Sequence, residues 1–305
     1  MAETFELETR RAIRTALVRD SYHNDRVRIV DPDIQGFDWL AATHKGLFAV
    51  TLGHAKLVAH GWFFGICRHG RDLYIFENCA LRDRTLALGR LMKMTMAAGA
   101  LSEPVVLAKG LDANCHQIEV IDGLLCVVDT ANQAILRFTL EGSLVDIKTP
   151  FPVTPATDRS GDHLHINSIA QIGDRIAVML HNGKAIPEKC SALAWLDADW
   201  NLQQRVPLDG RHCHDIVEDE AGAVWHSASM TGELMSSDGR RVKIDSDRMT
   251  RGLAMSADSV IVGVSSFGPR KNRDTLRGAV VILDRAFNRL AEIELGGPPA
   301  DIVAI

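Results

Sequence analysis

Five segments of the chain repeat one pattern, and this repeat constrains the fold more than any other feature of the sequence. In each segment a short apolar stretch leads to a turn containing Gly or Asp and then to a strongly apolar stretch. This order is typical of two antiparallel strands joined by a tight turn. The five segments cover residues 64–78, 116–130, 167–181, 214–228 and 251–265.

The spacing of the repeats predicts the architecture. Their first residues lie 52, 51, 47 and 37 positions apart, and further strand-like residues follow each pair. Four strands in such a unit is the size of a propeller blade. Residues 300–305 resemble an inner strand without its blade, and residues 37–62 resemble three strands without an inner one. The sequence therefore predicts an all-β, six-bladed propeller in one domain, 1–305, closed by 37–62 plus 300–305. Seven blades stay possible if residues 27–31 begin another sheet.

Composition narrows the classes of function. The 305 residues carry a formal net charge of −5, which disfavours a nucleic-acid partner. No apolar run of about eighteen residues occurs, so we expect no membrane partner. We see no secretory signal and no CxxC pair, and we expect a cytoplasmic protein with free thiols. The apolar spacing within residues 5–20 predicts a short helix in an N-terminal extension, 1–25.

A propeller brings equivalent residues of its inner strands around one central channel. The first residues of the repeats, with Ala300 for the closing strand, should converge there. We call them the channel positions: Phe64, His116, Asn167, His214, Arg251 and Ala300. His165 precedes Asn167 by two residues, so strand alternation predicts that it faces the same side. His116, His165 and His214 can then approach a common point, although His163, His212 or His226 can replace one of them.

Three histidines around one point favour a metal. Neutral imidazole is a common ligand of Fe, Cu and Zn, and three such ligands leave coordination positions open for a substrate. We therefore predict a transition metal ion on His116, His165 and His214. Four side chains are candidates to orient the rings through their second nitrogen. They are Asn114, Asp162, Asn167 and Asp215.

Arginines near the same mouth favour an anionic substrate. Arg251 holds a channel position, and Arg270 and Arg273 lie on the loop that follows its blade. Guanidinium groups bind carboxylates and phosphates through paired hydrogen bonds. Cys115 and Cys213 each precede a channel histidine, so alternation predicts that they pack between blades. The remaining histidines are interpreted as turn or surface residues: His23, His44, His54, His60, His69 and His181.

Two short motifs carry a resemblance to known propellers. At residues 250–273, which begin TRGLAMSADSVIVGVSS, and at 226–234, HSASMTGEL, the chain resembles an uncharacterised bacterial propeller family with an RGLA…VG(V/L)S inner strand. It is more distantly similar to the gluconolactonase/regucalcin and strictosidine-synthase propellers. Regucalcin-type enzymes hold a divalent metal with Glu, Asn and Asp, whereas this chain has His and Arg at those positions. The resemblance therefore implies the fold without the lactonase activity, and nitrogen ligands favour a transition metal.

These observations lead to one functional prediction with two alternatives. We expect a metal-dependent enzyme that acts on a small, anionic molecule by oxidative or lyase/hydrolase chemistry. Its catalytic residues are predicted to be Arg251, Asp215 and Asn167, and Arg251, Arg270 and Arg273 are predicted to bind the substrate. The first alternative is a non-catalytic propeller that binds a ligand or a protein. The second is a metal-independent hydrolase or lyase with a channel histidine as base.

Overall fold

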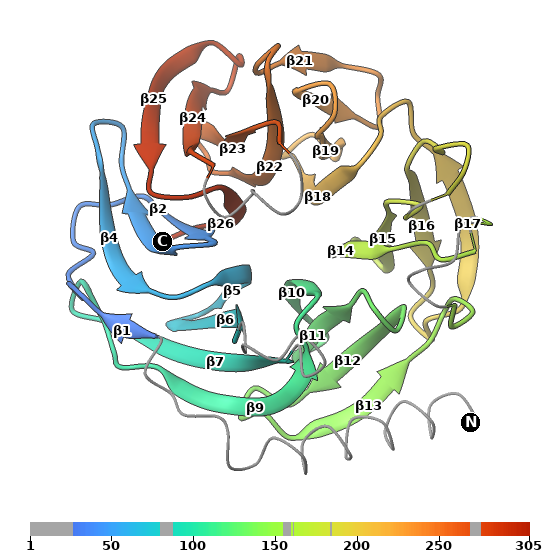
Figure 1. Cartoon of the computed structure of the whole chain (residues 1–305), viewed down its shortest axis with the longest axis horizontal. Helices are drawn as coiled ribbons and strands as arrows, with labels where there is room; N and C mark the ends of the chain where they lie inside the picture. Colours follow the sequence, from blue (N-terminus) through green and yellow to red (C-terminus); the bar gives the residue numbers. More distant parts are fainter. Residues whose placement is uncertain (1–26, 80–87, 155–159, 161, 184, 269–275) are drawn as a thin grey trace.

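The chain forms six antiparallel sheets arranged around a central channel (Figure 1). A computed structural model describes residues 27–79, 88–154, 160, 162–183, 185–268 and 276–305. The all-β, six-bladed propeller is confirmed, and the described residues contain strands without an α-helix. The predicted helix within 1–25, along with Arg270 and Arg273, lies outside the described residues. Within the described ranges no helix has the length and apolar character needed to cross a bilayer.

Each sheet begins with an inner strand at the channel and continues outward through antiparallel pairs of strands. The first blade after the closing sheet consists of β5 (Phe63–His69), β6 (Asp72–Asn78), β7 (Leu88–Ala97), β8 (Ala100–Leu101) and β9 (Val105–Asp112). The second consists of β10 (Cys115–Ile121), β11 (Leu124–Asp129), β12 (Ala134–Phe138) and β13 (Leu144–Lys148). The third consists of β14 (Ile166–Ile172), β15 (Arg175–Leu180), β16 (Ala192–Leu196) and β17 (Leu202–Pro207).

The fourth blade consists of β18 (Cys213–Glu218), β19 (Val224–Ala228), β20 (Glu233–Ser236) and β21 (Arg241–Lys243). The fifth consists of β22 (Arg248–Met255), β23 (Ser259–Ser266), β24 (Gly278–Asp284) and β25 (Arg289–Leu295). The sheet that closes the ring joins both ends of the described chain. It consists of β1 (Arg28–Ile29), β4 (Ala55–His60), β3 (Gly46–Val50), β2 (Trp39–Thr43) and β26 (Pro299–Ala304).

Ring closure depends on pairing between β2 and β26. These strands are antiparallel, with Leu40 opposite Val303 and Ala42 opposite Asp301. β26 is thus the inner strand of a sheet whose other strands come from residues 28–60. β1 pairs with β4 at the outer edge of this sheet and does not begin a seventh one. Without β26 the edge of β2 would be unpaired, so this pairing removes a template for aggregation.

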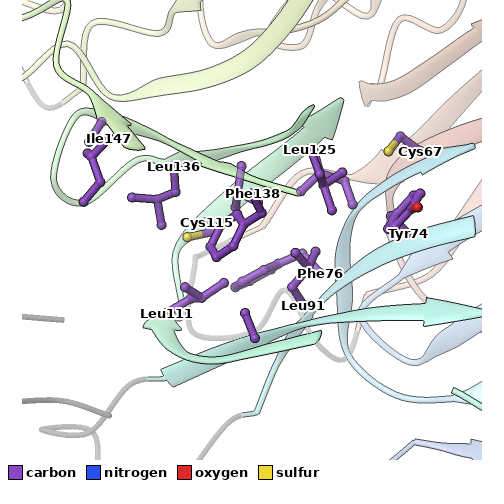
Figure 2. Packing of buried hydrophobic residues seen from close by; sticks show 14 residues of the cluster. Cys67, Tyr74, Phe76, Leu91, Leu111, Cys115, Leu125, Leu136, Phe138 and Ile147 are labelled. Carbon is purple, nitrogen blue, oxygen red and sulfur yellow. The ribbon is translucent and has the colours of Figure 1, made fainter. Parts of the chain in front are cut away.

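Apolar side chains fill the spaces between neighbouring sheets. Figure 2 shows the cluster between the sheets of β5 and β10, where Phe76, Cys115 and Phe138 are fully buried. Cys213 lies in the corresponding cluster between the sheets of β14 and β18. The prediction that Cys115 and Cys213 pack between blades is confirmed, and burial raises the pKa of Cys213 to about 12. A thiol with so high a pKa is a poor nucleophile.

Candidate functional site

Every inner strand is irregular at its channel position. The pairing of each inner strand with the second strand shifts register at or next to that residue, as between Cys115 and Ile118 and between Thr250 and Leu253. Equivalent shifts occur in the other four sheets. A bulge leaves residues out of the ladder and changes the direction of their side chains. The bulges therefore set which side chains reach the channel.

The bulges and the strand pairing define two further sets of equivalent residues beside the channel positions. Two residues before each channel position lies an entry position. The entry positions are Trp62, Asn114, His165, His212, Met249 and Pro298. Between the entry and channel positions lies one residue, which pairs with a residue of the second strand. The residue that directly follows this partner in the chain is the return position. The return positions are His44, Asn78, Thr130, His181, Ser229 and Ser265.

A cavity of about 360 Å³ lies where these three sets meet. Entry positions contribute Trp62, Asn114, His165, His212 and Met249, and channel positions contribute Phe64, His116, His214 and Arg251. Return positions contribute His44, Asn78 and His181, and Gly183 completes the lining. The cavity thus holds six of the twelve histidines of the chain. The lining residues that the structure describes include one arginine and no Asp or Glu, which favours an anionic occupant.

The three predicted histidines all reach this cavity, but they do not meet at one point. The ring centroids of His116 and His165 are 5.4 Å apart. His181 follows in the row, 4.6 Å from His165 and 5.5 Å from His214. Within the described residues no three or more His, Cys, Asp or Glu side chains are placed to hold a metal ion. The residues therefore do not fit the predicted three-histidine site, and the transition metal stays a prediction.

Two predicted surface histidines belong to the cavity, so that interpretation of His44 and His181 was wrong. Both follow the second strand of a blade, and both line the cavity. Burial and the neighbouring histidines hold the pKa of His181 well below its usual value, and its Nδ1 is buried with no hydrogen-bond partner among the described residues. Comparing the residues after each second strand, in addition to those of the inner strands, would have found them.

His116 is held in one tautomer by its own blade and the next. Its Nδ1 lies 2.6 Å from the backbone oxygen of Asn114 and 2.8 Å from Oγ1 of Thr130. The Thr130 hydroxyl donates its only hydrogen to the backbone oxygen of Ile166, at 2.7 Å. Both neighbours of Nδ1 must therefore accept, so Nδ1 carries the proton of the neutral ring. Nε2 remains the acceptor of His116.

His214 repeats this arrangement two blades further on. Its Nδ1 lies 2.8 Å from the backbone oxygen of His212 and 3.0 Å from Oγ of Ser229. The Ser229 hydroxyl donates to the backbone oxygen of Thr250, at 2.6 Å. Nδ1 therefore carries the proton here too, and Nε2 is the acceptor. Thr130 and Ser229 orient the two rings, and neither role was predicted from the sequence.

Arg251 affects the charge of His214. Burial first, and the positive Arg251 second, hold the pKa of His214 well below its usual value, so this imidazole is neutral at pH 7. The Arg251 guanidinium carbon lies 5.7 Å from the centre of the Phe64 ring. The cavity therefore places a permanent positive charge beside a neutral proton acceptor.

Asp215 and Asn167 contact the neighbouring blades, and neither lines the cavity. Asp215 Oδ2 accepts the backbone N–H of Gly252 at 3.0 Å, and Asn167 Nδ2 donates to the backbone oxygen of Cys213 at 2.9 Å. Among the alternative histidines, His212 lines the cavity and pairs with Glu188 at 2.5 Å. His163 is buried against Thr154, and His226 lines a separate cavity between the sheets of β14 and β18.

Comparisons with solved structures agree with the fold. A protein of unknown function from Bacteroides caccae is similar at 10% identity and a TM-score of 0.58, covering 88% of this chain and 98% of that one. A chain of a nidogen/laminin complex is similar at 11% identity and a TM-score of 0.61, covering 88% and 97%. Virginiamycin B lyase from Staphylococcus aureus has 13% identity and a TM-score of 0.47, covering 74% and 76%.

The first two likenesses establish the propeller fold and nothing about its chemistry. No protein-family model matches the chain, and no curated protein sequence matches it. The bacterial family suggested by residues 226–234 and 250–273 therefore stays a prediction.

Proposed function

We propose that the chain is an enzyme that binds a small organic anion in the channel cavity and removes a proton from it, with His214 as the base. The observation that carries this proposal is the fixed tautomer of His214. Its Nδ1–H is bound by the His212 carbonyl and Ser229, so its basic Nε2 serves the cavity. A positioned imidazole of this kind is the usual general base in enzymes.

Arg251 gives the base its selectivity for anions. The guanidinium favours a carboxylate or phosphate in the cavity, and its charge lowers the pKa of His214. An anion bound to Arg251 offsets that charge, so the basicity of His214 rises when the substrate is present. The proton that Nε2 accepts then makes an imidazolium, which the two oxygens on Nδ1–H stabilise.

His116 supplies a second ring with the same orientation. Thr130 fixes its tautomer as Ser229 fixes that of His214, and both rings belong to the same cavity. In this proposal His116 Nε2, an acceptor like that of His214, accepts a second proton or a hydrogen bond from the substrate.

The reaction class is abstraction of a proton from a carbon next to the acidic group, which leads to exchange with solvent or to elimination. In the elimination the electrons of the broken C–H bond form the double bond, and the leaving group departs with the electron pair of its own bond and takes a proton from His214 Nε2 or from water. Side chains supply both the base and the anion site, His214 and Arg251.

The test is proton exchange by the untagged protein in D₂O with a chelator present. A panel of short carboxylic and keto acids is followed by proton NMR for loss of C–H signals or elimination. We expect turnover of at least one acid, its loss in His214→Gln, and full activity in His54→Gln, an exposed histidine outside the cavity. Turnover that survives in His214→Gln contradicts the base, and turnover abolished by the chelator and restored by Zn²⁺ favours the predicted metal. Arg251-dependent binding without turnover identifies a binding protein.

A further inference from the structure

A second cavity, with a volume of about 540 Å³, lies against the closing sheet, beside β3 and β4. His44, Trp62 and Asn78 line both cavities. The two cavities therefore adjoin at three shared side chains. A two-carbon acid would fill only a small part of this volume.

The wall between the two cavities is aromatic. The ring centroid of Trp62 lies 5.5 Å from that of His44 and 6.3 Å from that of Phe64. Phe64 is in turn 5.5 Å from His116, so aromatic rings run without interruption from the proposed catalytic histidines to the second cavity. Such faces suit a flat apolar group. The indole Nε1 of Trp62 is buried and has no hydrogen-bond partner among the described residues, which leaves one donor for a ligand acceptor.

The far part of the second cavity combines apolar and positive groups. Phe48 and Leu57 line it, with the Phe48 ring lying close to Gly296. The stem of Lys45 lies along Gly297, and this lysine has no ion pair among the described residues. No Asp or Glu occurs among the lining residues that the structure describes. A ligand that reaches Lys45 would therefore place a second acidic group there.

We propose that the site takes an elongated aromatic acid with an acidic group at each end. One acidic group binds Arg251, the aromatic body lies along Trp62, and the second acidic group meets Lys45. This inference rests on the proposed function for its anion site at Arg251, and it extends that site by about 540 Å³ of further volume. A substrate without the tail would leave Trp62 Nε1 and Lys45 unused.

The test measures affinity along a series of acids by calorimetry. The probes are acetate, phenylalkanoates of increasing linker length, and the same phenylalkanoates with a para carboxylate. We expect the best phenylalkanoate to bind at least about tenfold more tightly than acetate, because the ring leaves water. The para carboxylate should add a further gain of about threefold or more, through Lys45.

Two variants, with one control, test where the ring and the second acidic group of the ligand bind. Leu57→Asp should remove most of the gain from the ring, and Leu52→Asp, an exposed leucine in the same blade but outside the cavity, should leave it unchanged. Lys45→Gln, at an exposed position, should remove only the gain from the second carboxylate. Thermal melting checks that each variant folds.

The outcomes separate this inference from the proposed function. Affinity that stays flat along the series, or a gain that survives both Leu57→Asp and Lys45→Gln, overturns the elongated ligand. Acids that bind the wild-type protein and Arg251→Gln equally overturn the anion site itself. Binding that depends on Arg251 without any gain from the ring leaves the proposed function standing and removes only the extension.

Discussion

His214 and Asp215 are neighbours on one strand, yet they belong to different parts of the molecule. His214 lines the cavity, whereas Asp215 accepts the backbone N–H of Gly252 from the next blade. Burial shifts the pKa values of both side chains, in opposite directions. It holds the pKa of His214 well below its usual value and raises the pKa of Asp215 to about 6.

The residues after the other channel positions show that the role of Asp215 is general. Gln117 accepts the backbone N–H of Ile169, and Asp301 accepts that of Ile66. In the same way Ser168 accepts the backbone N–H of Asp215 itself. Four inner strands thus use this position to bond to the next blade. A perturbed pKa beside a cavity therefore identifies a buried group, and the direction of its contacts shows whether it serves construction or chemistry.

The largest expected effect is on the cavity side of this comparison. Arg251→Gln removes the only arginine among the described lining residues. We expect the affinity for a phenylalkanoate to fall by about tenfold to a hundredfold, because hydrogen bonds to charged groups contribute about 1.5–3 kcal/mol. Calorimetry at pH 7 measures it. An unchanged affinity would place the anion elsewhere.

The next largest effect concerns Asp215, which bonds to the next blade. The carboxyl of Asp215 titrates near 3.9 when unfolded and near 6 when folded. Between these values the unfolded state ionises first, so stability falls as the pH rises from about 4 to 6 and then levels off. Asp215→Asn should remove this fall and raise the free energy of unfolding at pH 7 by on the order of 2 kcal/mol.

Urea unfolding across pH 4–8 checks the Asp215→Asn variant, with Asp199→Asn, an exposed aspartate, as its control. Anion affinity should not weaken in Asp215→Asn, because its side chain does not line the cavity. A loss of turnover with unchanged substrate affinity would instead support the original prediction that Asp215 is catalytic.

The histidines of the cavity should have the opposite pH dependence. The pKa of His181 is lowered well below the value of about 6.5 that it has when unfolded. Below pH 6.5 the unfolded state therefore binds the proton first, and stability is lost as the pH falls. His181→Gln should reduce this loss, by on the order of 1 kcal/mol at pH 5. A pH profile identical to that of the wild-type protein would show that His181 is not buried as a neutral ring.

The smallest effect concerns the hydroxyl groups that orient the rings. Ser229→Ala removes one acceptor from His214 Nδ1 and the donor to the Thr250 carbonyl, while the His212 carbonyl remains. We expect a loss of about 0.5–1.5 kcal/mol in stability and a more loosely oriented His214 ring, whose proton stays on Nδ1 because the His212 carbonyl still accepts it. Thr130→Val should do the same at His116, and each variant serves as the control for the other ring in ¹⁵N NMR.

The sequence was sufficient to predict the fold and several of the side chains that line the cavity. The repeat predicted six blades, because each blade has to bury its faces against its neighbours. Equivalence between blades also predicted that His116, His214 and Arg251 face one channel. These inferences hold because they depend on strand order and spacing, which the sequence displays directly.

The other residues of the cavity depend on bulges and on strand register, which the alternation of apolar and polar residues does not reveal. Bulges at the inner strands break the period of two, so Asn167 bonds to Cys213 although alternation places it in the channel. His44 and His181 arrive from second strands, and only the strand register reveals that they are equivalent. The positions of the His116, His165 and His214 rings depend on the directions of their side chains, which the sequence does not display. The prediction therefore placed the three rings closer to a common point than they are.

The tautomer of His214 tests the central claim most directly. The measurement is ¹⁵N NMR of histidine-labelled protein at pH 7 in metal-free buffer, with His214→Gln to assign the signals. The account predicts a neutral ring with its proton on Nδ1, and a shift of Nε2 toward the protonated form when a phenylalkanoate is added to the wild-type protein but not to Arg251→Gln. A proton on Nε2 in the free protein, or an Nε2 signal that ignores the bound anion, would contradict the account.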